Sequence, residues 1–223
     1  MLEKAGNLLE SSVAEGELTD LAASLSDVTL EMILKAGDAF PIFSFLTKGV
    51  KATMDIREAF FAEKVFKFLK SLGEAPEAER QKMIKEIQES EKYRQKFGKF
   101  SIVVLERLND DLKAEYLGRA AKYLVVGDID YGFYQRFALI LDALFIDDLH
   151  RLTDNNFLSI GDNHYDHYLS LGLISVSMRL PNESETRMAR KMNPNIIKVS
   201  HRHLTDKGLK VKNILLDLPI KST

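Results

Sequence analysis

The stretch FGKFSIVVLERLNDDLKAEYLGRAAKYLVVGDIDYGFYQRFALILDALFIDDL, residues 97–149, has the densest apolar periodicity in the chain. Its apolar residues recur at steps of three or four, and this spacing places them on one face of a helix. They form two sets, one before and one after the glycine at 127: Leu112, Tyr116, Ala120 and Leu124, then Phe133, Phe137, Leu141 and Leu144. We therefore expect a central antiparallel pair of helices over about residues 99–145.

The turn between these helices has its own local signals. Gly127 suits the position just after the first helix, where the backbone takes a positive φ. Asp130 suits the N-cap of the second helix, and the Asn-Asp-Asp run at 109–111 can cap the first. Capping explains these acids better than a calcium loop, because the Gly and Glu that an EF-hand needs at positions six and twelve are absent.

Charge divides the chain near residue 150. Residues 150–223 carry eleven Lys/Arg and seven Asp/Glu, whereas residues 1–149 carry twenty and twenty-six, and all five His lie at or after position 150. The chain has 223 residues and 45% hydrophobic content, which is ordinary for a soluble protein of one or two domains. We predict a mainly α fold, with a multi-helix N-terminal domain (1–149) followed by a small α+β domain (150–223).

Several reaction classes are disfavoured by what the sequence lacks. There is no Cys, which removes disulfides, thiolate catalysis and Cys-ligated metals. There is also no P-loop, no G-x-G-x-x-G and no nucleophile elbow. We predict a non-enzymatic protein without a cofactor. The first twenty residues do not resemble a signal peptide and no apolar run spans a bilayer, so we expect a cytoplasmic location.

The N-terminal half contains the most apolar segments. We expect a short helix over 2–13 that docks loosely, a second over 21–37, an apolar stretch over 39–54, and a helix over 56–73 with an aromatic stripe. The stripe is typical of core packing. The alternative is a membrane-perturbing hairpin over 39–69, and the residues predicted to contact a membrane or partner are Phe40, Ile42, Phe43, Phe45 and Leu46.

After residue 155 the pattern changes. A helix predicted to end at Gly172 is followed by a strand over 174–180, a polar loop, a strand over 196–204 and a helix capped by Thr205. This order resembles that of winged-helix domains, and the resemblance covers about residues 146–217. It implies a contact module for DNA or for protein.

The helix that a winged-helix domain would place in the DNA major groove begins DNHYDHY at residue 162, with two carboxylates and no Lys or Arg. A carboxylate next to phosphate is repulsive, so we favour protein contacts. DNA binding stays an alternative through phosphate contacts from the loop and second strand, for which the candidates are Arg187, Arg190, Lys191, Lys198 and Arg202.

Four histidines offer a weak metal candidate. His164 and His167 are three apart on a predicted helix, and His201 and His203 alternate along a predicted strand, so each pair shares a face. Four imidazoles could bind zinc. Without HExxH or a placed base, hydrogen-bonded surface histidines are the better interpretation, and we predict no metal site.

Three segments carry a family resemblance. They are IREAFFxxKVxxFL from residue 56, FGK at 97–99 with LERLNDDxKAxxLGR from 105, and GDIDYGFY from 127. Together they resemble a family of uncharacterised bacterial helical proteins, many from prophages or mobile elements, over about residues 39–149. The resemblance implies a helical domain of bacterial or phage origin and transfers no active site.

These observations converge on a bacterial protein that binds macromolecules without catalysis. Its expected partner is another protein or a second copy of itself, and the mobile-element setting implied by the resemblance suggests a role in phage defence or mobile-element conflict. The alternatives are a membrane-perturbing effector that uses residues 39–69 and a winged-helix DNA-binding regulator.

Overall fold

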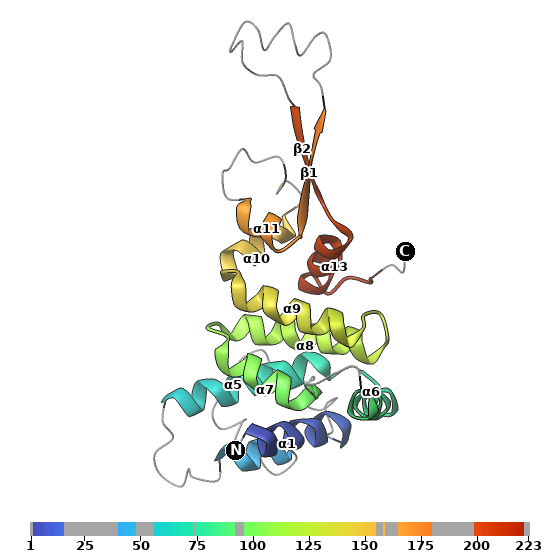
Figure 1. The fold of residues 1–223 in the computed structure, drawn as a ribbon. Coiled ribbons are helices and arrows are strands. Elements are labelled where there is room, and N and C mark those ends of the chain that lie inside the picture. The colour runs from blue at the N-terminus through green and yellow to red at the C-terminus, as the bar shows by residue number, and fades with distance from the viewer. Residues whose placement is uncertain are drawn as a thin grey trace, which may run out of the picture.

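The chain forms an elongated stack of helices from which a two-stranded sheet projects at one end (Figure 1). The structure is a computed structural model, and it describes residues 2–15, 40–47, 56–73, 75–91, 96–154, 158, 165–179 and 199–220. The mainly helical fold with a small sheet is confirmed. The elements are α1 (Leu2–Glu15), α4 (Pro41–Thr47), α5 (Ile56–Leu72), α6 (Glu77–Glu89), α7 (Phe97–Arg107), α8 (Asp111–Val125), α9 (Tyr131–Ala143), α10 (Ile146–Thr153), α11 (Asp166–Ser170), β1 (Ile174–Arg179), β2 (Val199–Leu204) and α13 (Asp206–Leu215).

Helix α8 lies at the centre of the stack and contacts α5, α6, α9 and α13. Its most extensive contact is with α5 rather than with its sequence neighbour α9. Gly118 makes this possible, because a Cβ at that position would overlap the carbonyl oxygen of Phe68 on α5. The two backbones therefore touch, with Leu117 and Ala121 fully buried beside the crossing. The predicted α8–α9 pair exists, but the core is built around α5 and α8.

Helix α1 packs tightly, so the prediction that residues 2–13 dock loosely is wrong. Leu9 and Val13 are fully buried, and Gly6 crosses α7 so closely that a Cβ there would lie 2.7 Å from the backbone nitrogen of Lys99. The buried Glu10 carboxylate accepts hydrogen bonds from Gly98 N (2.7 Å) and Gln88 Nε2 (2.6 Å). It satisfies an amide in the first turn of α7, where a negative charge is stabilising.

The predicted helix ends in the central stretch are confirmed. Asp110 Oδ1 accepts from Leu112 N (2.8 Å) at the start of α8, and Asp130 Oδ1 accepts from Phe133 N (2.6 Å) at the start of α9. Gly127 follows α8 with φ +84°. Local side-chain chemistry therefore sets the boundaries of both helices.

The C-terminal elements follow the predicted order of helix, strand, strand and helix. β1 and β2 are antiparallel, with Ile174 opposite Leu204. Thr205 caps α13 by accepting from Gly208 N (3.0 Å), and its hydroxyl donates to the carbonyl of Gly172 (2.7 Å). This threonine ties α13 to the turn between α11 and β1. The predicted helix over 21–37, the polar loop after residue 180 and positions 196–198 lie outside the described residues.

Candidate contact surfaces

An apolar groove lies where α1, α4, α5 and α7 meet, with a volume of about 600 Å³. Phe60 of α5 lines this groove and is 61% exposed, and Ile56, one turn earlier on the same helix, is 72% exposed. We call this feature the apolar groove. Its apolar lining consists of Leu2, Ala5, Phe45, Leu46, Phe60, Phe61 and Ile102.

The rim of the apolar groove is charged but balanced, with Arg57 and Lys64 against Glu58 and Glu106. The Lys64 ammonium donates to the carbonyl oxygens of Leu108 (2.8 Å) and Glu106 (3.2 Å), and so caps the end of α7. Burial lowers the pKa of Lys64, while the charge of Glu106 raises it. The two bases and two acids among the described lining residues balance, and Lys4 Nζ lies 5.6 Å from the ring centroid of Phe45.

The five predicted contact residues separate into two groups. Phe40, Ile42 and Phe43 are buried in the core, where Phe43 packs against Phe66 with ring centroids 6.0 Å apart. They are part of the core in this structure, because α4 packs against α1 and α5. Only the partly buried Phe45 and Leu46 reach the apolar groove.

The sequence pattern alone did not predict Ile56 or Phe60 as contact residues. They stand four apart and so share a face of α5, displaced from the core stripe that begins at Phe61. The sequence therefore shows two apolar faces on this helix. Which of them faces the core depends on where α8 lies, and the periodicity of α5 alone does not show this.

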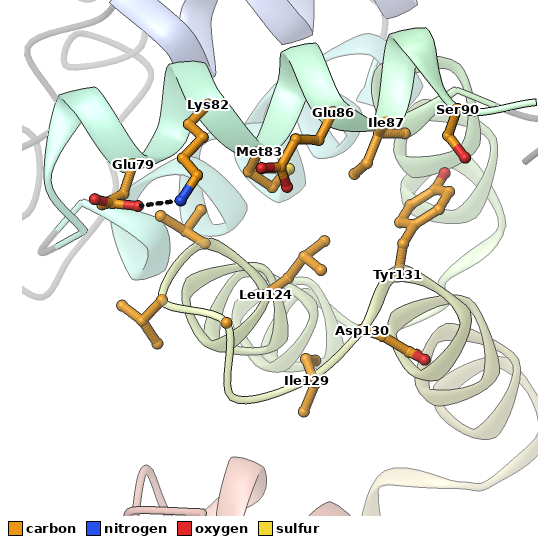
Figure 2. Close-up of a pocket in the computed structure, with 13 residues that line it drawn as sticks. Glu79, Lys82, Met83, Glu86, Ile87, Ser90, Leu124, Ile129, Asp130 and Tyr131 are labelled. Carbon is orange, nitrogen blue, oxygen red and sulfur yellow. Dashed lines mark ion pairs between the residues drawn. The ribbon is translucent and has the colours of Figure 1, made fainter.

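A second hollow lies between α6 and the turn that joins α8 to α9, with a volume of about 330 Å³ (Figure 2). We call it the α6–α8 cleft. Met83 and Ile87 project from α6 toward Leu124, and Tyr131 rises from α9 toward Ser90. The charged groups on its lining are Glu79, Lys82, Glu86 and Asp130, and Glu79 pairs with Lys82 at 4.0 Å.

A polar joint attaches α13 to α8. Lys122 Nζ lies 2.8 Å from Asp217 Oδ1, and the Tyr123 hydroxyl lies within donating distance of that oxygen (3.1 Å) and of Leu218 O (2.9 Å). Arg119 donates to Leu215 O (2.6 Å). Burial and the neighbouring Asp217 raise the pKa of Tyr123 to about 12. Burial of Asp217 opposes its ionisation, but the hydrogen bond and charge of Lys122 outweigh this and lower its pKa.

Of the predicted nucleic-acid contacts, the structure describes only Arg202. Its guanidinium carbon lies 4.0 Å from the ring centroid of Tyr165, a cation–π geometry that covers the start of α11. The other four, Arg187, Arg190, Lys191 and Lys198, lie outside the described residues. Their grouping with Arg202 stays a prediction.

Of the four histidines considered as metal ligands, the structure describes the side chains of two. His167 is exposed, with its ring centroid 5.6 Å from that of Tyr168, and His203 is exposed opposite Ser175 on β1. His164 and the side chain of His201 lie outside the described part. Within that part, no group of three or more His, Cys, Asp or Glu side chains is placed to hold a metal ion.

Comparison with known protein families, with curated proteins and with solved structures finds no match. The family resemblance of residues 39–149 therefore stays a prediction from sequence. Among the described helices, none is both long enough and apolar enough to cross a bilayer.

Proposed function

We propose that this chain is a non-enzymatic protein-interaction protein that binds an apolar segment of a partner protein in the apolar groove. One observation carries the proposal: Phe60, which is 61% exposed, lines a hollow of about 600 Å³ with an apolar floor. Protein interfaces combine an aromatic and aliphatic centre with a polar rim, and a few central aromatic residues dominate their affinity.

The balanced rim favours a protein partner over a membrane. Surfaces that bind anionic lipid are rich in Lys and Arg around their apolar face. Here the two bases on the rim stand beside two acids, and the Lys64 ammonium is engaged by backbone carbonyls.

The C-terminal end is proposed as a second contact module with a winged-helix-like arrangement. The paired strands, the Thr205-capped α13 and the packing of α10 against α13 support this arrangement. The roles in phage defence or mobile-element conflict and the cytoplasmic location remain predictions that rest on the sequence alone.

The absence of Cys from the chain permits a direct test of the apolar groove. A photoactivatable crosslinker attached to Phe60→Cys should capture a partner in cells of the host, whereas the same label at Leu139→Cys should not. Leu139 lies on α9 with 56% exposure, so it matches Phe60 in apolar character and accessibility.

The captured protein is then purified and its affinity measured. We expect Phe60→Asp to weaken binding by about tenfold or more, as for a central aromatic contact, and Leu139→Asp to leave it unchanged. Equal effects of the two variants, or capture from both positions alike, would refute the proposed groove. Leakage of liposomes that depends on Phe60 would instead establish the membrane alternative.

A further inference from the structure

The α6–α8 cleft combines an apolar floor with an acidic rim. Met83 and Ile87 of α6 face Leu124 across it, and Val126 lines it with 52% exposure. An apolar group that enters would meet side chains on both walls. The volume of about 330 Å³ lies near the lower end of the range for small ligand sites, about 300–1,000 Å³.

The charges on the rim select the sign of the ligand. Three acidic residues and one basic residue line the cleft, and the ammonium of Lys82 is paired with Glu79. The Asp130 carboxylate points away from α6 (Figure 2). Asp130 uses one oxygen to cap α9, and this cancels the positive end of that helix. The Glu86 carboxylate has no ion-pair or hydrogen-bond partner within the described part of the chain.

The helix ends around the cleft also favour a cation. The last residues of α8 line it, and the C-terminal end of a helix carries partial negative charge. The corresponding end of α6 is already compensated, because the Lys96 ammonium donates to the carbonyls of Ile87 (3.1 Å), Gln88 (2.7 Å) and Ser90 (3.2 Å). The remaining negative potential comes from Glu86 and the end of α8.

We propose that the α6–α8 cleft binds an apolar group that carries a cationic nitrogen, with the apolar part between Met83 and Leu124 and the nitrogen beside Glu86. This chemistry is found in a small organic amine and in a lysine or arginine side chain next to an apolar residue of a peptide. The site is separate from the apolar groove and does not depend on the function proposed for it.

The test uses two probes with the same apolar body and opposite charge, phenethylamine and 3-phenylpropionate. The readout is the ¹³C-methyl resonance of Met83, assigned with Met83→Leu. Phenethylamine should shift this resonance saturably with a Kd of about 1 mM, the affinity expected for so small a ligand, and 3-phenylpropionate should not. Equal shifts from both probes, or no saturable shift from the amine, would overturn the proposal.

Two matched variants on α6 complete the experiment. Glu86→Gln keeps the shape of the side chain but removes its charge, and should weaken phenethylamine binding about threefold to fivefold. Glu89→Gln makes the same change one turn away, outside the cleft, and should have no effect. An identical response of the two variants would contradict the role of Glu86.

A second titration distinguishes a small organic amine from a lysine side chain of a peptide as the ligand. N-acetyl-Leu-Lys-amide is titrated in the same way, with N-acetyl-Leu-Glu-amide as its control. Tighter binding of the lysine peptide than of phenethylamine assigns the cleft to a partner chain, and tighter binding of the free amine assigns it to a small molecule. Either result supports the site, whereas preference for the glutamate peptide would overturn it.

Discussion

At the residue scale, Asp217 has a strained backbone conformation and also forms an ion pair with Lys122. It is the only non-glycine residue with positive φ in the described part of the chain, at 52°. It follows the end of α13, where Leu218 N donates to Asn213 O (2.8 Å), in a position that usually holds glycine. Asp and Asn tolerate this conformation better than other side chains. The same carboxylate accepts from Lys122 Nζ (2.9 Å), so one residue both ends α13 and attaches it to α8.

Three substitutions of Asp217 should separate these two contributions. Asp217→Ala loses the ion pair and keeps the strained backbone, so we expect a loss of about 1–2 kcal/mol of unfolding free energy. Asp217→Asn should lose less than about 1 kcal/mol, and Asp217→Gly should be near neutral, because relief of strain offsets the lost pair, which is partly exposed. Urea unfolding measures all three, and equal losses for Ala and Gly would contradict this account.

The raised pKa of Tyr123 predicts that the stability contributed by the α8–α13 joint depends on pH. Its folded-state pKa of about 12 lies above the ordinary value of 10, so its stabilising contribution is complete below pH 10 and is lost as the pH rises through 12. The neutral phenol donates to Asp217 or Leu218, whereas a phenolate would repel the Asp217 carboxylate. The difference in urea midpoint between the wild type and Tyr123→Phe should shrink across this interval. A difference that is constant with pH would show that Tyr123 acts by packing alone.

At the element scale, glycines decide how closely the helices approach. Gly118 lets α8 touch α5, and Gly98 lets α7 touch α1, where a Cβ would overlap the carbonyl oxygen of Gly6. Interiors are packed too tightly to absorb such an overlap without a shift of the backbone. The small residues at these crossings therefore fix which helices are neighbours.

We expect Gly118→Ala to destabilise the protein by about 1–3 kcal/mol through overpacking, despite the better helix propensity of alanine. The control is Gly132→Ala in α9, where the nearest atom to the added Cβ is the side-chain oxygen of Asp130 at 3.3 Å. There the propensity gain should make the effect neutral or stabilising by up to about 1 kcal/mol. Thermal and urea unfolding check both, and a stabilising Gly118→Ala would refute the close crossing.

Helix boundaries were predictable from sequence because their causes are local. Asp110, Asp130 and Thr205 each bond to an amide two or three residues ahead, and Gly127 acts through its own φ. The position of α1 was not predictable in this way. Its contact face uses Gly6, a buried Ser12 and the Glu10 carboxylate, and these side chains do not register as an apolar stripe.

At the scale of the whole molecule, the candidate surfaces arise only between elements. The apolar groove is lined by four helices and the α6–α8 cleft by three, drawn from segments far apart in the chain. The sequence indicated Phe45 and Leu46 but not Phe60, because the exposure of Phe60 depends on which helices pack against α5. Charge composition favoured a boundary near residue 150, yet buried side chains of α13 belong to the same core cluster as those of α8.

This continuous core predicts that the described elements unfold together. Val211, Ile214 and Leu215 pack into the cluster, and the α8–α13 joint adds polar contacts. The chain has no Trp, so single substitutions at exposed positions on distant helices, Phe60→Trp on α5 and Leu209→Trp on α13, report each region separately. We expect the two fluorescence transitions in urea to coincide with each other and with the loss of helical circular dichroism, as in a two-state transition. An earlier transition at Leu209→Trp would instead show that residues 150–223 form a separate folding unit, as the charge boundary suggests.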